Sequence, residues 1–156
     1  MPARHKTLHS LAAREKPVDS ASLKPGLPAA WQAVEAPFIV HRHGYYYLFV
    51  SWDLCCKGAQ STYRVMAGRA KKITGPYLDE GGKDMFQGGG TGVLQANQAW
   101  RGPGGESILL GSPGDLIVYH AYDATSGKPA LRISSLDWSN GWPHASLSTS
   151  SGPPSQ

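Results

Sequence analysis

The chain has 156 residues, a formal net charge of +4, and 19 glycines and 12 prolines. Helical periodicity is scarce, while Tyr, Trp, Val and Ile cluster in short runs, so a turn-rich, mainly β protein is expected. No apolar run approaches the roughly 20 residues that span a bilayer, and the N-terminus lacks the apolar core of a signal peptide. The densest basic cluster, Arg69, Lys71 and Lys72, is far smaller than the stripe of a nucleic-acid binder. We therefore expect neither membrane insertion nor nucleic-acid binding.

The two ends of the chain differ in composition from its middle. Residues 1–30 carry Ser, Pro, Lys and Arg without an apolar period, which predicts a disordered or loosely packed segment. Residues 145–156 form a low-complexity polar tail. The ordered domain is therefore expected to cover residues 31–144.

The first ordered unit reads as a β-hairpin followed by further strands. Two apolar runs, Phe38–Arg42 and Tyr45–Trp52, flank a His-Gly turn. Alternation predicts a third strand at Thr62–Ala70. Ile73–Tyr77 then predicts a turn into a possible short fourth strand, and Gly88–Gly92 a glycine loop.

A second unit repeats the first. Strands are expected at Ser107–Leu110 and Leu116–Ala121, joined by a Pro-Gly-Asp turn, and then at Leu131–Leu136. Gly105–Asp123 corresponds to Glu35–Asp53 at a shift of 70 residues without a gap. A repeated hairpin with a third strand indicates propeller blades, although a β-sandwich with two similar hairpins remains an alternative. Two such units do not close a ring, so open blade faces are expected.

The only two cysteines, Cys55 and Cys56, are adjacent in the sequence. Neighbouring Cα atoms lie about 3.8 Å apart, which is below the usual disulfide range of about 4.4–6.8 Å. A disulfide between them would be unusual, and we expect two free thiols on opposite faces of a strand end. No Cys/His cluster with zinc-ligand spacing is present.

Six sequence strings within residues 33–143 follow one another in an order that is found in a known family. They read VEAPFIV (Val34–Val40), GYYYLFVSWDLCCKG (Gly44–Gly58), STYRVMAGRAKKITGPY (Ser61–Tyr77), GGGT (Gly88–Thr91), GPG (Gly102–Gly104) and VYHAYDA (Val118–Ala124). Together they resemble the arabinanases of glycoside hydrolase family 43. The resemblance implies an all-β fold, a partial five-bladed β-propeller of about two to three antiparallel blades. It also implies inverting hydrolysis of α-1,5-linked arabinofuranosyl chains in arabinan, by an extracellular or periplasmic protein.

The resemblance implies three catalytic acids, of which this chain matches one. Glu35, in the EAPF string, corresponds to the general acid. The general base and a second Asp belong to earlier blades, and their strings have no counterpart here. We therefore expect a truncated enzyme that is inactive alone, with the missing N-terminal blades as a possible partner. By residue type alone, Glu35 would be a solvated residue before a strand, and a non-catalytic carbohydrate-binding or structural remnant is the alternative function.

The resemblance also suggests residues around the acid. Trp52, Cys55, Cys56 and Thr91 are candidates for contacts with the sugar, although a buried blade tryptophan is an equal alternative for Trp52. His120 corresponds to a histidine that holds a metal ion, usually calcium, largely through water. Calcium prefers oxygen ligands, so one imidazole predicts a weak site.

One string departs from the family pattern. After GPG, relatives commonly have His-Asn-Ser, whereas this chain has Gly105, Glu106 and Ser107. The resemblance implies that this position faces the substrate, so a difference in substrate positioning is expected, and Glu106 is expected to be an unpaired acid. Asp53 and Asp123, which end corresponding strands, are expected to cap turns rather than to act in catalysis.

Overall fold

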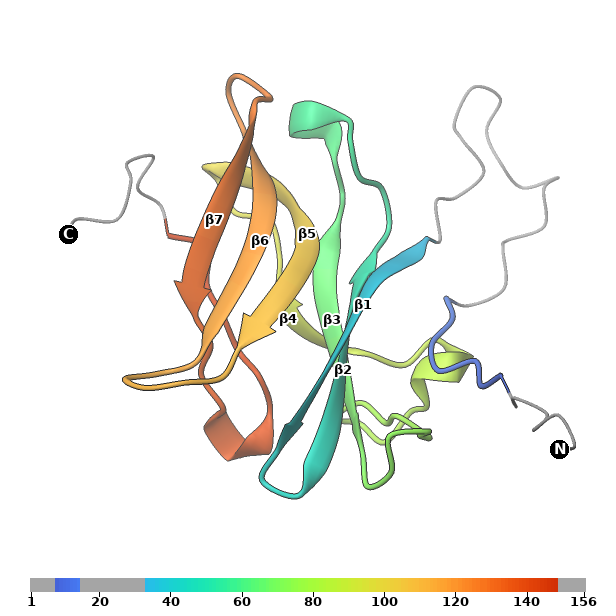
Figure 1. Cartoon of the computed structure of the whole chain (residues 1–156). Coiled ribbons are helices and arrows are strands. Elements are labelled where there is room, and N and C mark those ends of the chain that lie inside the picture. Colours follow the sequence, from blue (N-terminus) through green and yellow to red (C-terminus); the bar gives the residue numbers. More distant parts are fainter. Residues whose placement is uncertain (1–7, 15–32, 149–156) are drawn as a thin grey trace, which may run out of the picture.

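The computed structural model describes residues 8–14 and 33–148, which form two antiparallel sheets side by side (Figure 1). Sheet A has the order β1-β2-β3-β4, and sheet B has the order β5-β6-β7. The expected all-β partial propeller is confirmed, with each sheet as one blade. The strands are β1 (Val34–Arg42), β2 (Tyr45–Trp52), β3 (Arg64–Ala70), β4 (Thr91–Leu94), β5 (Trp100–Leu109), β6 (Leu116–Asp123) and β7 (Pro129–Ser135).

The first hairpin forms where the sequence predicts it. Arg42 pairs with Tyr45 across a two-residue turn in which His43 and Gly44 both have positive φ angles, as a tight hairpin turn requires. Strand β1 begins four residues before its predicted start, at Val34. A bulge between Glu35 and Phe38 interrupts the pairing there, and such bulges re-aim side chains at the rim of a sheet.

The fourth strand of sheet A lies elsewhere than predicted. Ile73–Tyr77 forms the predicted turn, with Gly75 at a φ of 82°, but the chain after it adds only an isolated bridge at Leu78 in place of the possible short strand. The chain instead makes a long excursion and returns through the glycine loop as β4, which pairs with β3. The residues of the excursion thereby gather at one end of sheet A.

The main core lies between the two sheets. Tyr47 and Phe49 of β2 pack in one buried cluster with Ile117, Tyr119 and Ala121 of β6. Their spacing of two follows the alternation of a strand. The contact between the blades is therefore apolar, and burial of such area is the main favourable term in folding.

Strand β2 is buried on its other face as well. Leu48 and Val50 join a second cluster with Met66, Tyr77 and Met85. Strand β2 is therefore apolar along most of its length, because both of its faces are buried.

Residues 8–14 cover part of this second cluster, on the side of sheet A away from sheet B (Figure 1). Leu11 and Ala12 pack against it, and the amide of Ala13 donates to the carbonyl of Met85 at 2.8 Å. This part of the stretch predicted to be loosely packed is therefore attached to the sheet. Residues 1–7 and 15–30 of that stretch lie outside the described residues.

The start of the predicted polar tail is attached in the same way. The amide of Ala145 donates to the carbonyl of Val93 at 3.2 Å, and Leu147 is buried. Residues 149–156 lie outside the described residues. No helix within 8–14 and 33–148 is long and apolar enough to cross a membrane.

Sheet B presents an uncovered apolar face. Leu131 and Ile133 of β7 are 75% and 55% exposed and lie outside the core cluster between the sheets. Exposed apolar patches of this kind mark interaction surfaces. The expected open blade face is thus present, in the position that a neighbouring blade occupies in a closed ring.

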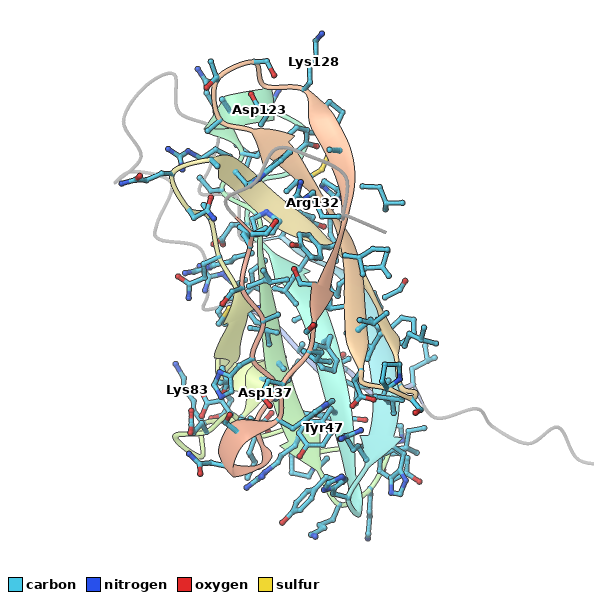
Figure 2. The ribbon with its side chains drawn as sticks, turned by 90° about the vertical axis from the view of Figure 1, so that its left-hand side faces the viewer. Tyr47, Lys83, Asp123, Lys128, Arg132 and Asp137 are labelled. Atoms are coloured by element: carbon cyan, nitrogen blue, oxygen red, sulfur yellow. A yellow bond between two sulfur atoms is a disulfide. The ribbon has the colours of Figure 1, made fainter. Side chains whose placement is uncertain are left out.

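The molecule has two distinct ends. In Figure 1 the β6–β7 turn lies at the top and the β1–β2 turn at the bottom, and β1 runs downward, so Glu35 near its start lies on the side of the β6–β7 turn. Figure 2 shows Asp123 and Lys128 at the first end and Tyr47, Lys83 and Asp137 toward the second. We call these the Glu35 end and the turn end.

A glycine in β5 controls the distance between the sheets. A Cβ atom on Gly104 would lie 2.2 Å from Cδ1 of Tyr63 and 2.9 Å from Oγ of Ser51. We expect Gly104→Ala to lower the free energy of unfolding by about 1–3 kcal/mol through overpacking, measured by urea denaturation. The control is Gly114→Ala, where a Cβ meets nothing within 4 Å, with an expected change below about 0.5 kcal/mol. Equal losses in both variants would contradict this account.

Candidate active site

Glu35 is an exposed carboxyl held by a buried tyrosine. The hydroxyl of Tyr63, just before β3, donates to Oε2 of Glu35 at 2.7 Å. Tyr63 is only 3% exposed, and burial together with this hydrogen bond raises the pKa of its hydroxyl above the ordinary value. The hydroxyl therefore stays protonated and acts as a fixed donor, which orients the carboxyl.

An apolar cavity of about 550 Å³ lies beside Glu35. Pro37 and Ile39 of β1 line it together with Leu11 from the N-terminal segment. Phe38 points the other way and packs against the core between the sheets. The surroundings of Glu35 are thus apolar on the cavity side.

A second carboxyl, Glu106 of β5, is buried between the two sheets. The hydroxyl of Ser51 donates to its Oε2 and accepts the amide hydrogen of Gly105 at 2.9 Å. The expectation of an unpaired acid was therefore wrong, because Ser51 on the facing sheet is its partner. Glu106 is 3% exposed, and burial raises its pKa to about 7. The other oxygen, Oε1, finds no hydrogen-bond partner in the described part of the chain.

His120 of β6 stands next to Tyr63. The two ring centres are 5.9 Å apart, and burial lowers the pKa of His120, which favours the neutral imidazole. Gly105 has a φ of 64°, and a Cβ atom there would lie 2.9 Å from Nδ1 of His120. The His120 ring therefore packs against Gly105 at the place where a side chain would begin, and a Cβ atom there would displace the ring.

Five residues from distant parts of the chain converge in this way, and we call them the Glu35 cluster. They are Glu35, Ser51, Tyr63, Glu106 and His120. Sequence reasoning named Glu35 and His120 and missed the roles of Ser51 and Tyr63. Both lie inside strings that match the family, which was the available signal, but nothing in a string shows which side chains meet.

Cys55 and Cys56 are joined by a disulfide, so the expectation of two free thiols was wrong. That expectation assumed a strand end with alternating faces. Strand β2 in fact ends at Trp52, and Cys56 has a positive φ of 68° in the loop that follows. This loop lies at the Glu35 end, and Sγ of Cys55 is 3.8 Å from the hydroxyl of Tyr122.

Two other predicted contact residues are placed away from the Glu35 cluster. Trp52 is 4% exposed, and the guanidinium of Arg14 stacks 4.3 Å from the centre of its ring. Thr91 is in β4, at the edge of sheet A opposite β1, where its hydroxyl accepts the amide hydrogen of Glu80 at 2.8 Å. The structure thus gives both residues packing or turn contacts.

Asp53 and Asp123 have structural contacts. Asp53 forms ion pairs with Arg14 and Arg64, each at 3.0 Å. Asp123 accepts the amide hydrogens of Thr125 and Ser126, and the bonds from Ser126 lower its pKa. The second carboxylate caps a turn as expected, whereas the first anchors the N-terminal segment.

His120 is the one imidazole of the Glu35 cluster that could serve as a metal donor. Nε2 of His120 is buried and has no hydrogen-bond partner within residues 8–14 and 33–148. No group of three or more His, Cys, Asp or Glu side chains in those ranges could hold an ion. Because calcium prefers six to eight oxygen ligands, this donor set does not by itself complete a calcium site.

The comparisons with known proteins place these two blades in a family. The model for Glycosyl hydrolases family 43 matches residues 4–143. The "Extracellular endo-alpha-(1->5)-L-arabinanase 1" of Bacillus subtilis is 49% identical over 129 residues, covering 82% of this chain and 39% of that protein. The "Extracellular exo-alpha-(1->5)-L-arabinofuranosidase ArbA" of Cellvibrio japonicus is 42% identical over 144 residues, covering 91% and 40%.

Solved structures agree with this assignment. The arabinanase of Cellvibrio cellulosa complexed with arabinohexaose superposes with a TM-score of 0.75 at 42% identity, covering 88% of this chain and 43% of that one. The family 43 endo-arabinanase of Bacillus licheniformis gives 0.72 at 45% identity, covering 89% and 43%. The two sheets are blades of a β-propeller of the glycosidase type. The chain belongs to glycosyl hydrolases family 43, and it spans about two fifths of the length of these relatives.

The buried carboxyl of Glu106 makes stability depend on pH. Its pKa is raised from 4.5 to about 7, so the folded state favours the protonated form. The contribution of protonated Glu106 to the free energy of unfolding is complete below pH 4.5 and is lost as the pH rises through about 7. At about 1.4 kcal/mol per pKa unit, the loss is on the order of 3 kcal/mol.

We expect Glu106→Gln to remove this loss, because the amide stays neutral and still accepts from Ser51. The difference in unfolding free energy between the two proteins should grow between pH 4.5 and 7.5, as measured by urea denaturation at each pH. Glu80→Gln, at an exposed carboxyl, serves as the control and should show no such trend. A difference that is constant with pH would contradict the burial of a titrating Glu106.

Proposed function

We propose that this chain carries the general-acid part of an inverting arabinanase, with Glu35 as the acid. The observation that supports it most directly is the hydrogen bond from buried Tyr63, which fixes an exposed carboxyl beside an apolar cavity in a family 43 blade. A general acid must reach the glycosidic oxygen, and among the acids of the Glu35 cluster this one is exposed whereas Glu106 is not.

Inversion requires a second carboxylate that activates water on the opposite face of the sugar, about 6.5–9.5 Å from the acid. Three other acids singled out above are poor candidates, because Glu106 is buried, Asp53 is ion-paired and Asp123 caps a turn. We therefore propose that the general base and the second Asp come from polypeptide outside these 156 residues, and that this chain is inactive alone.

The proposed substrate is α-1,5-linked arabinan or its oligosaccharides, as in the names of the relatives. The proposed location is extracellular or periplasmic, and the Cys55–Cys56 disulfide supports it, because disulfides persist in oxidising compartments. The disulfide loop lies at the Glu35 end, so we assign Cys55 and Cys56 to the sugar-binding rim. The N-terminal blades of a complete propeller are the proposed partner for the apolar face of sheet B.

Calcium belongs to the same proposal only in a limited sense. The neutral His120 would face the ion through water, with oxygen ligands from outside the described residues, and the bound ion would balance the negative charge of the acids. In this chain, His120 would border the position of the ion. No catalytic step is assigned to it.

The first test is the chain by itself. We expect no release of arabino-oligosaccharides from debranched arabinan, because the base that activates water is not supplied. The measurement is chromatography of the products after extended incubation. Turnover above background that disappears in Glu35→Gln would show that these residues form a complete site and would overturn the proposal.

The second test supplies the missing part. Mixing or fusing the chain with the N-terminal blades of a relative should restore hydrolysis, and Glu35→Gln should then lower kcat by about 10²–10⁴-fold, as expected for loss of a general acid. Tyr63→Phe, which keeps the ring and removes only the donor to Glu35, should give a smaller loss. An assembled complex in which Glu35→Gln retains full activity would exclude Glu35 as the acid.

A further inference from the structure

A second cavity, of about 600 Å³, lies at the turn end of sheet A. Tyr45 at the start of β2, Arg69 near the end of β3, the following lysines and Trp142 line it. Tyr45 pairs with Arg42, seven residues along β1 from Glu35, which places the two ends of the strand roughly 23 Å apart. This cavity is therefore separate from the Glu35 cluster, and no role in hydrolysis accounts for it.

Arg69 is held rigidly at the wall of this cavity. Its guanidinium carbon lies 4.6 Å from the ring centre of Tyr45 and 4.4 Å from that of Trp142. Nη1 donates to the carbonyl of Gly141 at 3.1 Å. One hydrogen bond occupies only part of the five-donor fork, so a pre-oriented guanidinium remains for a planar, charged acceptor.

Two lysines add to the positive charge. Nζ of Lys71 lies 3.4 Å from the ring centre of Tyr45, and its hydrogen bond and charge lower the pKa of that hydroxyl. Lys72 is exposed and lines the same cavity. Within residues 8–14 and 33–148, none of Arg69, Lys71 and Lys72 lies within ion-pair distance of a carboxylate.

The acids of the cavity do not cancel this charge at close range. Asp79 accepts the backbone amide hydrogens of Lys83 and Gly90, one on each carboxylate oxygen. Its charge is therefore engaged by the backbone of its own loop. Glu80 is exposed at the rim. The three cations therefore line the cavity without a carboxylate paired to them. Asp79 is hydrogen-bonded to backbone amides, and Glu80 is exposed to solvent.

We propose that this cavity binds a carboxylate-bearing sugar, that is, a uronic acid unit of a glycan. The guanidinium fork and the two ammonium groups match a carboxylate, and the apolar side chains of Pro76 and Leu78 in the same lining offer a surface for a sugar ring. The volume is that of a small-molecule site and exceeds what a bare inorganic anion fills. Binding here is independent of catalysis at Glu35, so the chain could hold an acidic glycan at the turn end whether or not it hydrolyses arabinan.

The test compares two sugars that differ in one group. The ¹⁵N-labelled chain is titrated with D-glucuronate and, separately, with D-glucose, while backbone amide shifts are followed by NMR. Saturable shifts at residues 69–75 with glucuronate and none with glucose are expected. The variant Lys71→Gln/Lys72→Gln, which changes two exposed side chains, should weaken binding by about tenfold or more, because it removes two charged hydrogen-bond donors.

The matched control is Lys57→Gln/Lys128→Gln, which removes the same charge from two exposed lysines away from the cavity; Lys128 is at the Glu35 end (Figure 2). This control and Glu35→Gln should both bind glucuronate as the parent chain does. Equal shifts with glucose, or an equal loss in the control variant, would overturn the proposal. Displacement by inorganic phosphate at the same concentration as glucuronate would also overturn it, because the site would then recognise any oxyanion rather than an acidic sugar.

Discussion

The close approach of β5 to Tyr63 is the contact on which the rest of this structure depends. Gly104 allows it, because any larger residue would overlap the tyrosine ring. The approach buries Tyr63, whose hydroxyl then orients Glu35, and it brings Glu106 within reach of Ser51. Packing between two blades therefore positions the acid cluster, and the catalytic proposal rests on a structural contact.

The same contact has an energetic cost. A carboxyl buried between apolar sheets loses its hydration, and a single serine partner does not fully replace it. The raised pKa of Glu106 expresses that cost. A cluster that contains such a group favours conditions near or below neutrality. The apolar face of sheet B is exposed to solvent, which is also unfavourable. We propose that the remaining blades cover that face.

Much of the fold was predictable because local signals agreed with it. The His-Gly turn and the alternating strands predicted β2 at its observed bounds and β3, β6 and β7 to within two residues. Strand β5 was predicted to begin seven residues too late, because its glycines obscure the strand pattern. Two bulges continue the pairing past these glycines. Strand β4 was missed because Thr91–Leu94 becomes a strand only by pairing with β3.

The amino-acid sequence by itself determined most of the strands, the repeated hairpin and the family strings that single out Glu35. These features depend on neighbouring residues or on similarity along the chain. Only the tertiary structure decided the partner of Glu106, the disulfide and the cation-lined cavity. Each of these depends on which side chains meet: Ser51 and Glu106 are 55 positions apart, and Arg69 and Gly141 are 72 apart. Such meetings follow from the packing of sheets, which no local pattern records.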